Sequence, residues 1–431
     1  MIPTRASLIC ALFATACGSS VTVAPLDAAT TDIVTSDTVT IDGSAPDVAA
    51  PDVAAPSACA RWAVSDQVVV VSDPAERVRY LLDAVATPDG ALVAWRELAP
   101  NGQDDQVRVR RVNDDGTLHP WSAPGRGSRR QVVSLTRMGD LQFSMVWDAA
   151  RDGVALLTNA PADRGACHFT RFLGDDSQSW QLVDLSTIEG FPLAGCGSLA
   201  RTLTGWSLLA AEVRATWGDQ LVFLTEDGRI AGTPTRLPMT QSPSIDPMTR
   251  TAVAGGFVAT WSERDPMPPR TGLELHARRF DPSGAPLGDD VLLDRANTTY
   301  FLPRVLDTRE GLLAAWYANG IVFRPLRADA SPSGGAVRVD GVLAAFGVHA
   351  EVRGADTLAV TSTAVSDTSM SQFFFLVADG RGALRGAPMR VLPDRPLMFA
   401  NGLRVVPTRR GALIVFGQGE RVLAVPVDCV P

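Results

Sequence analysis

The chain has 431 residues, of which 46% are hydrophobic, so it is long enough to bury a sizeable core. Its 39 basic residues are all arginine and are outnumbered by 47 acidic residues, which gives a formal net charge of −8. One arginine and six acids precede Ala58, which leaves 38 basic and 41 acidic residues after it, a balance of about −3 that excludes the basic excess of a nucleic-acid-binding domain.

The first sixteen residues have the features of a secretory signal peptide. A single positive charge, Arg5, precedes a short apolar run at 6–14, and small residues lead from it to Cys17. The apolar run is too short to cross a bilayer, which takes about 20 apolar residues. The sequence therefore predicts an exported protein whose signal peptide is residues 1–16.

The residues before Cys17 resemble the lipobox of bacterial lipoproteins, in which small residues precede a cysteine. Thr15 and Ala16 fit that pattern, whereas Ala14 stands where the family usually has leucine. The resemblance implies that Cys17 is acylated on sulfur and becomes the mature N-terminus, held in the membrane by a stable anchor of several acyl chains. Because Gly18 rather than aspartate follows, it also implies the outer membrane, on its periplasmic or extracellular face. The alternative is an ordinary signal peptidase site after Ala16, which would leave Cys17 free.

Residues 17–57 predict a disordered acidic tether behind the lipidated cysteine. Aspartates recur every five residues from Asp27 to Asp52, and the sequence Asp-Val-Ala-Ala-Pro occurs twice in tandem. Small residues, proline and like charges cannot bury enough apolar surface to fold. A coil of this length reaches on the order of 35 Å r.m.s., so we expect it to hold the following domain away from the membrane surface.

From Ala58 onward a weak repeat runs through the chain with an average spacing of about 54 residues. Its clearest unit is a small residue followed by an apolar strand that often ends in tryptophan. A run that is apolar at every position predicts a strand buried on both faces. The seven copies begin at Gly90, Gly153, Gly205, Gly256, Gly311, Asp356 and Gly411.

A second unit, an alternating strand that ends in an acidic-glycine turn, follows most of these copies. Examples span 107–116, 221–228, 273–284 and 373–380. Alternation of apolar and polar residues places one face of the strand on a core, and the Asp-Gly pairs supply the positive φ of a tight hairpin. A short strand precedes each glycine copy and another follows each turn, so that each repeat contains four strands.

Four-stranded repeats of about 40 to 55 residues resemble the blades of β-propellers. We therefore predict that residues 58–431 form an all-β domain, a β-propeller of seven four-stranded blades. The last repeat, Leu403–Pro431, stops after its third strand, and a lone strand, Gln67–Val71, precedes the first full repeat. The N-terminal strand is expected to complete the last blade and close the ring. Six or eight blades are the alternatives, because the second repeat is irregular and the fifth is short.

Four cysteines lie in the predicted domain: Cys59, Cys167, Cys196 and Cys429. An even number in an exported domain favours two disulfides, for which three pairings exist. Ring closure would bring Cys59 to Cys429, which leaves Cys167 for Cys196. The first bond would close a very long loop and stabilise the fold by up to about 5 kcal/mol in the chain-entropy description. A metal site is the alternative, although no Cys-x-x-Cys pair is present.

No sequence pattern in the domain indicates catalysis, a cofactor or a metal. Its histidines, 119, 168, 276 and 349, form no metal-binding spacing, and neither a nucleophile elbow nor a phosphate-binding loop occurs. Propeller glycosidases carry carboxylates on the first strands of their blades. Asp83, Glu189, Asp246 and Asp307 fall near such strands, but acids fall there by chance too often to predict a site.

These observations favour a non-enzymatic binding or scaffolding lipoprotein of the bacterial cell envelope, which presents its propeller to a protein partner. The alternative is an extracellular carbohydrate-binding or carbohydrate-active propeller, a lectin or glycosidase that acts on a surface glycan. Neither hypothesis involves nucleic acid or a cofactor.

Overall fold

The computed structural model describes residues 59–72, 77–98, 104–118, 130–136, 143–149, 153–160, 166–173, 181–184, 193–212, 219–237, 249–264, 273–296, 301–318, 320–339, 344–364, 370–393, 397–398 and 400–430. The predicted signal peptide, Cys17 and the tether lie outside these residues. Within them, no helix is long and apolar enough to cross a membrane. The strands belong to one compact unit, Val53–Pro431.

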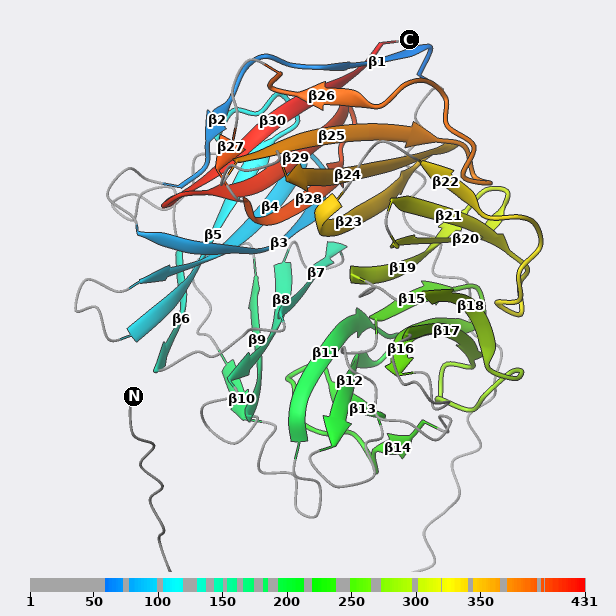
Figure 1. Ribbon diagram of the computed structural model, residues 1–431. Coiled ribbons are helices and arrows are strands. Elements are labelled where there is room, and N and C mark those ends of the chain that lie inside the picture. Colours follow the sequence, from blue (N-terminus) through cyan, green and yellow to red (C-terminus); the bar gives the residue numbers. More distant parts are fainter. Residues whose placement is uncertain are drawn as a thin grey trace, which may run out of the picture. The chain divides into compact units, whose positions relative to one another are not determined.

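Antiparallel sheets follow one another along this unit and stand as blades in a ring (Figure 1). Blade 1 contains β3 (Val78–Thr87), β4 (Gly90–Leu98), β5 (Asp104–Asn113) and β6 (Arg130–Thr136). Blade 2 contains β7 (Phe143–Asp148), β8 (Gly153–Ala160), β9 (Ala166–Leu173) and β10 (Gln181–Asp184). Blade 3 contains β11 (Leu193–Arg201), β12 (Gly205–Glu212), β13 (Asp219–Thr225) and β14 (Thr235–Arg236).

The remaining blades repeat this order of strands from the ring axis outward. Blade 4 contains β15 (Thr249–Val253), β16 (Gly256–Arg264), β17 (Leu273–Phe280) and β18 (Val291–Ala296). Blade 5 contains β19 (Phe301–Thr308), β20 (Gly311–Tyr317), β21 (Ile321–Leu326) and β22 (Val337–Val339). Blade 6 contains β23 (Ala344–Arg353), β24 (Asp356–Ala364), β25 (Met370–Ala378), β26 (Met389–Val391) and β27 (Leu397–Met398). Blade 7 contains β28 (Ala400–Pro407), β29 (Gly411–Gln418) and β30 (Arg421–Val430) from the C-terminus. The predicted seven-bladed, all-β propeller is confirmed.

The N-terminal segment completes blade 7 in two pieces, β1 (Arg61–Val64) and β2 (Val69–Val70). Both pair antiparallel with β30, so that Trp62 lies opposite Cys429 and Val69 opposite Ala424. The predicted closing strand, Gln67–Val71, is confirmed at Val69 and Val70, which pair with β30 as β2, and β1 extends the pairing to residues before the predicted strand. The ring is closed by residues from both ends of the domain.

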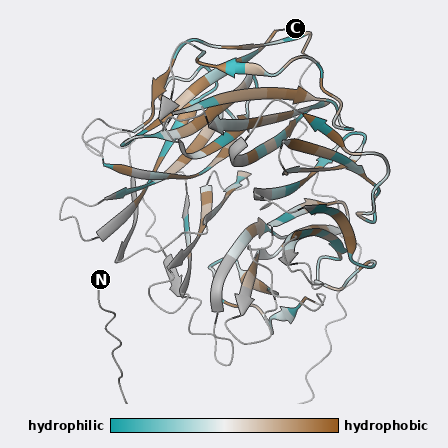
Figure 2. Cartoon of the chain, in the orientation of Figure 1, coloured by the Kyte–Doolittle hydropathy of each residue, from teal (hydrophilic) through white to brown (hydrophobic). Residues whose placement is uncertain are grey.

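The core is divided among the junctions between neighbouring blades, with one apolar cluster of described residues at each. Along β20, Leu312, Ala314 and Trp316 face blade 4, whereas Leu313 and Ala315 face blade 6. This alternation explains why the second strands are apolar at every position, since both of their faces are buried. In Figure 2 the hydrophobic colouring accordingly runs along the strands, with hydrophilic residues mainly at turns.

The glycine that opens most second strands is required by the close approach of the third strand. A Cβ at Gly90, Gly256 or Gly411 would lie 2.0, 2.0 or 1.9 Å from a backbone carbonyl oxygen of the third strand. No side chain fits at that distance without a shift of the backbone. The repeat signal in the sequence therefore records the contact between two neighbouring strands.

We expect Gly411→Ala to lower the free energy of unfolding by about 3 kcal/mol, because the added methyl group collides with the carbonyl of Val427. The matched control is Gly288→Ala, where nothing lies within 4 Å of the added Cβ, and which should change stability by less than about 0.5 kcal/mol. Urea unfolding followed by tryptophan fluorescence measures both. Equal effects of the two substitutions would show that this contact does not explain the glycine.

The turns between third and fourth strands share one conformation in blades 1, 3, 4, 5 and 6. In each, two residues that are six positions apart pair as an antiparallel bridge, as Val112 and Leu118 do in blade 1. The residue four positions after the first of the pair has positive φ: Gly116, Gly228, Gly284, Ala330 and Gly382. An aspartate accepts the turn's N–H groups, as Asp281 does from Ser283 and Ala285. The predicted Asp-Gly rule holds at Gly116 and Gly228, but in blade 6 the positive φ belongs to Gly382 and not to Gly380.

Candidate functional site

The first strands of the blades surround the ring axis (Figure 1). Their polar side chains form hydrogen bonds across the blade junctions. We call this set of residues the inner belt: Asp83, Ser144, Ser198, Thr249, Thr251, Arg304, His349, Glu351 and Arg404. Each of the seven junctions is crossed by at least one of its hydrogen bonds. The belt is therefore the polar counterpart of the apolar clusters farther from the axis.

Asp83 of β3 joins three blades. Its Oδ1 accepts a hydrogen bond of 3.0 Å from Nε of Arg404 in blade 7, and its Oδ2 accepts one of 3.2 Å from the backbone N–H of Met145 in blade 2. Arg404 also donates through Nη2 to the carbonyl of Leu82 at 3.1 Å. Asp83 is only 8% exposed, so these hydrogen bonds replace those that its carboxylate would make to water in the unfolded chain.

Arg304 of β19 and Glu351 of β23 form an ion pair between blades 5 and 6. The side chains are 34% and 35% exposed. Both residues lie on first strands, the innermost strands of their blades. Desolvation raises the pKa of the Glu351 carboxyl, against the opposing effect of the Arg304 guanidinium.

His349 connects blade 6 to blade 7 from a position that is 4% exposed. Its Nδ1 accepts a hydrogen bond of 3.2 Å from the N–H of Val405, which places the proton of the neutral ring on Nε2. Nε2 points toward Glu351, 3.8 Å from Oε1. Burial, together with the charges of Arg304 and Arg404, holds the pKa of His349 well below its usual range.

In blades 2 to 4 the inner belt consists of uncharged hydroxyl side chains, which accept or donate hydrogen bonds across the junctions. Ser144 Oγ accepts from the N–H of Leu199 at 3.0 Å across the junction of blades 2 and 3. Thr249 Oγ1 donates to the carbonyl of Pro303 at 2.6 Å across the junction of blades 4 and 5. The charged members thus gather where blades 5, 6, 7 and 1 meet, and that arc is the candidate site.

In chemical terms the arc holds two carboxylates that are both bonded to guanidinium groups of neighbouring blades. Such carboxylates fix the positions of the blades. Both oxygens of Asp83 accept hydrogen bonds, whereas Glu351 accepts from Arg304 through Oε1. Of the two pairs, Arg304–Glu351 is the more exposed and offers donors and acceptors side by side to a polar group on the axis. Among the described residues, no three His, Cys, Asp or Glu side chains are grouped so as to hold a metal ion.

We expect acid to destabilise the protein partly through His349. Because its folded-state pKa lies below the unfolded value of 6.5, the unfolded chain binds the extra proton, and stability falls as pH drops below 6.5 by up to about 1.4 kcal/mol per pH unit. Glu351 acts in the opposite direction, because its folded-state pKa is raised. Urea unfolding between pH 7 and 5 should show a shallower loss of stability for His349→Asn and a steeper one for Glu351→Gln. An unchanged slope in His349→Asn would contradict this assignment.

A shallow hollow of about 590 Å³ lies among turns of blades 7 and 1. It is lined by Asp89, Asn113, Asp114, Asp115, Arg409 and Arg410. Its charges are largely engaged, since Asp89 pairs with Arg111 and Arg410 pairs with Asp428 at 2.7 Å. The hollow therefore presents a mixed surface of nearly balanced charge.

The predicted Cys59–Cys429 disulfide is present and joins the start of the closing segment to β30. Cys167 lies on β9 and Cys196 on β11, but their side chains lie outside the described residues, so their pairing stays a prediction. Cys17 also lies outside.

Of the four acids noted near first strands, Asp83 belongs to the inner belt, whereas Asp307 lies exposed near the end of β19. Glu189 and Asp246 lie outside the described residues. His276 lies on β17, where it stacks on Trp261 with 5.7 Å between the ring centroids. Sequence reasoning missed Arg304, Glu351 and Arg404. The signal that could have found them is their position on first strands, where a charged side chain interrupts an apolar pattern.

Similarity to known proteins is limited to solved structures. No protein-family model matches the sequence, and no curated protein matches it. Among solved structures, the β-propeller domain of the Trilobed protease from Pyrococcus furiosus is 8% identical with a TM-score of 0.44, covering 81% of this chain and 94% of that chain. An endo-arabinase from Bacteroides thetaiotaomicron is 12% identical with a TM-score of 0.34, covering 67% and 94%. A puromycin-hydrolyzing peptidase from Mycobacterium tuberculosis is 12% identical with a TM-score of 0.48, covering 82% of this chain and 54% of that chain. This likeness concerns the β-propeller fold alone.

Proposed function

We propose that this chain is an exported, lipid-anchored β-propeller that serves as a non-enzymatic binding or scaffolding component of the bacterial cell envelope. The observation that carries the proposal is the engagement of both inner-belt carboxylates, Asp83 and Glu351, by arginines of neighbouring blades. A hydrolase needs carboxyl groups that are free to exchange protons with its substrate. Here these groups hold the scaffold, which leaves the faces of the ring for recognition of a partner.

Export is supported by the Cys59–Cys429 disulfide, since such bonds persist in oxidising compartments. The anchor is supported by the lipobox-like residues at Cys17, and an outer-membrane destination by Gly18. Labelling cells with a radioactive fatty acid tests the anchor. Cys17→Ser should lose the label and move to the soluble fraction, whereas Cys59→Ser should keep it. A Cys17→Ser protein that still carries the label would overturn this part of the proposal.

The partner is best sought by photo-cross-linking, because a chain without lysine gives amine-reactive reagents no side chain to couple to. A photoreactive amino acid is placed singly at exposed turn positions, Asp115 and Glu310, and at the rim position Leu292 as control. The same envelope protein captured in whole cells at the turns but not at the rim supports scaffolding. Capture of polysaccharide at the turns, or no capture at any position, would contradict it.

A carbohydrate-binding function is the second candidate, and the Arg304–Glu351 pair favours it. A guanidinium beside a carboxylate, each about one third exposed toward the axis, matches the adjacent hydroxyl groups of a sugar. A glycan array probed with the protein tests it. Binding that Glu351→Gln abolishes, while the exposed-surface control Glu420→Gln keeps it, would establish this candidate in place of scaffolding.

A further inference from the structure

The two sulfurs of the closing disulfide stand in different electrostatic surroundings. Nη1 of Arg353, on β23 of blade 6, lies 3.1 Å from Sγ of Cys59. The same guanidinium donates to the carbonyls of Thr408 at 2.9 Å and Arg409 at 2.7 Å, and its centre lies 5.3 Å from the centroid of the Trp62 ring. These contacts fix a positive charge against one sulfur only.

Other charged groups keep this asymmetry. Asp356 interacts with Arg353 but is itself bonded to Arg385 and Trp62, and Asp114 adds a weaker attraction. Asp428 precedes Cys429 on β30, so its side chain points to the opposite face of the strand, where its carboxylate pairs with the exposed Arg410. A thiolate is stabilised by a neighbouring cation. In thiol–disulfide exchange the sulfur that forms the more stable thiolate leaves faster.

We propose that the Cys59–Cys429 bond is a directional exchange site for a dithiol partner, in which the incoming thiolate bonds to Sγ of Cys429 and Sγ of Cys59 leaves as the thiolate beside Arg353. Both cysteines are partly exposed at the edge of the apolar cluster between blades 6 and 7. The proposal concerns the assembly of the closing blade and is independent of what the propeller binds.

The reaction balances as two successive displacements. In the first, a new bond joins the partner's sulfur to Cys429, the Cys59–Cys429 bond breaks, and its electron pair leaves on Cys59. In the second, the partner's second thiolate attacks the partner's first sulfur, which is bonded to Cys429. Cys429 then leaves as a thiolate. Two electrons have then passed from the partner's dithiol to the cystine. An oxidised partner forms the bond through the same mixed disulfide in reverse.

Reduced glutathione serves as the probe. The mature oxidised protein in detergent is exposed to it briefly, exchange is stopped with acid, and the modified cysteine is identified by mass spectrometry. Cleavage before aspartate yields 52–65 with Cys59 as its only cysteine, and cleavage after Arg421 yields 422–431 with Cys429. We expect glutathione on Cys429 in at least about fivefold excess over Cys59.

Two variants separate the charge effect from simple access. Arg353→Gln should bring the ratio of the two adducts close to one. Arg381→Gln, which removes an exposed guanidinium of the same blade that pairs with Glu310, should keep the wild-type ratio. Equal modification in the wild-type protein, or an excess on Cys59, would overturn the proposal. The wild-type ratio decides the matter even if Arg353→Gln does not fold.

Discussion

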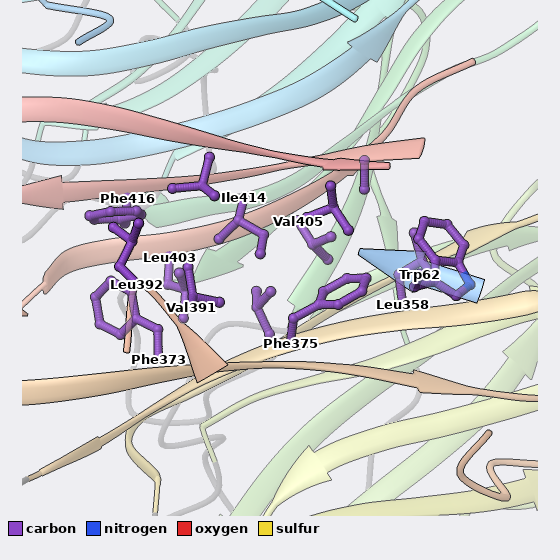
Figure 3. Close-up of a cluster of buried hydrophobic side chains, with 14 of the residues drawn as sticks. Trp62, Leu358, Phe373, Phe375, Val391, Leu392, Leu403, Val405, Ile414 and Phe416 are labelled. Atoms are coloured by element: carbon purple, nitrogen blue, oxygen red, sulfur yellow. The ribbon is translucent and has the colours of Figure 1, made fainter. Parts of the chain in front are cut away.

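Replacing Trp62 with alanine is expected to lower the free energy of unfolding by about 3–5 kcal/mol, the usual cost of removing a buried tryptophan. Trp62 lies on β1 of the N-terminal segment, is 9% exposed and projects into the apolar cluster between blades 6 and 7 (Figure 3). Its ring centroid lies 5.8 Å from that of Phe375. Its Nε1 donates to Oδ2 of Asp356 at 3.1 Å. The substitution leaves a cavity and a buried carboxylate with one donor fewer.

Urea unfolding at fixed pH measures this change, and Tyr80→Ala is the matched control. Tyr80 is an aromatic residue of blade 1 that is 47% exposed, so its removal should cost less than about 1 kcal/mol. Cys59→Ser removes the disulfide that ties the residues just before β1 to β30. The double variant Trp62→Ala/Cys59→Ser should therefore lose less stability than the sum of the two single losses. Full additivity would show that the closing strand does not detach as one unit.

The blades were predictable because the second strand of each blade is buried on both faces. This burial requires a continuous apolar run, and the run recurs at regular spacing in the sequence. The closure was predictable for a related reason, since a missing fourth strand at one end and an unpaired strand at the other leave open edges. The Cys59–Cys429 disulfide was predictable from this closure, because the two cysteines lie at the two ends of the domain. Only the extent of the closing strand differs from the prediction, because β1 (Arg61–Val64) is four residues long and too short to show the pattern of a repeat.

The inner belt could not be predicted, because its contacts do not repeat. Asp83 and Arg404 are 321 residues apart. The equivalent first-strand positions of other blades carry different residue types, such as Ser144, Thr249 and His349. Asp356 shows the same limit: it stands where six other copies have glycine, and the reason is Trp62, 294 residues away. A periodic pattern records what every blade needs, whereas these residues meet the needs of single junctions.

Asp83→Ala is expected to lower the free energy of unfolding by about 2–4 kcal/mol, because it leaves two donors on neighbouring blades without their acceptor. The guanidinium of Arg404 and the N–H of Met145 both point at this carboxylate, and the Asp83 and Arg404 side chains are only 12% and 16% exposed. Since Asp83 joins blades 7, 1 and 2, hydrogen exchange should accelerate in β3 and β7 more than in β19.

Removing both charges separates the cost of an orphaned arginine from the value of the pair itself. The double variant Asp83→Ala/Arg404→Met should be less destabilised than the sum of the single variants, because no unpaired charge is left near the axis. The control pair, Arg77–Glu420, has its charged atoms 3.7 Å apart and its side chains 63% and 67% exposed. Glu420→Ala should change stability by less than about 0.5 kcal/mol, as exposed ion pairs do. If Asp83→Ala had as small an effect, the inner belt would not hold the blades together.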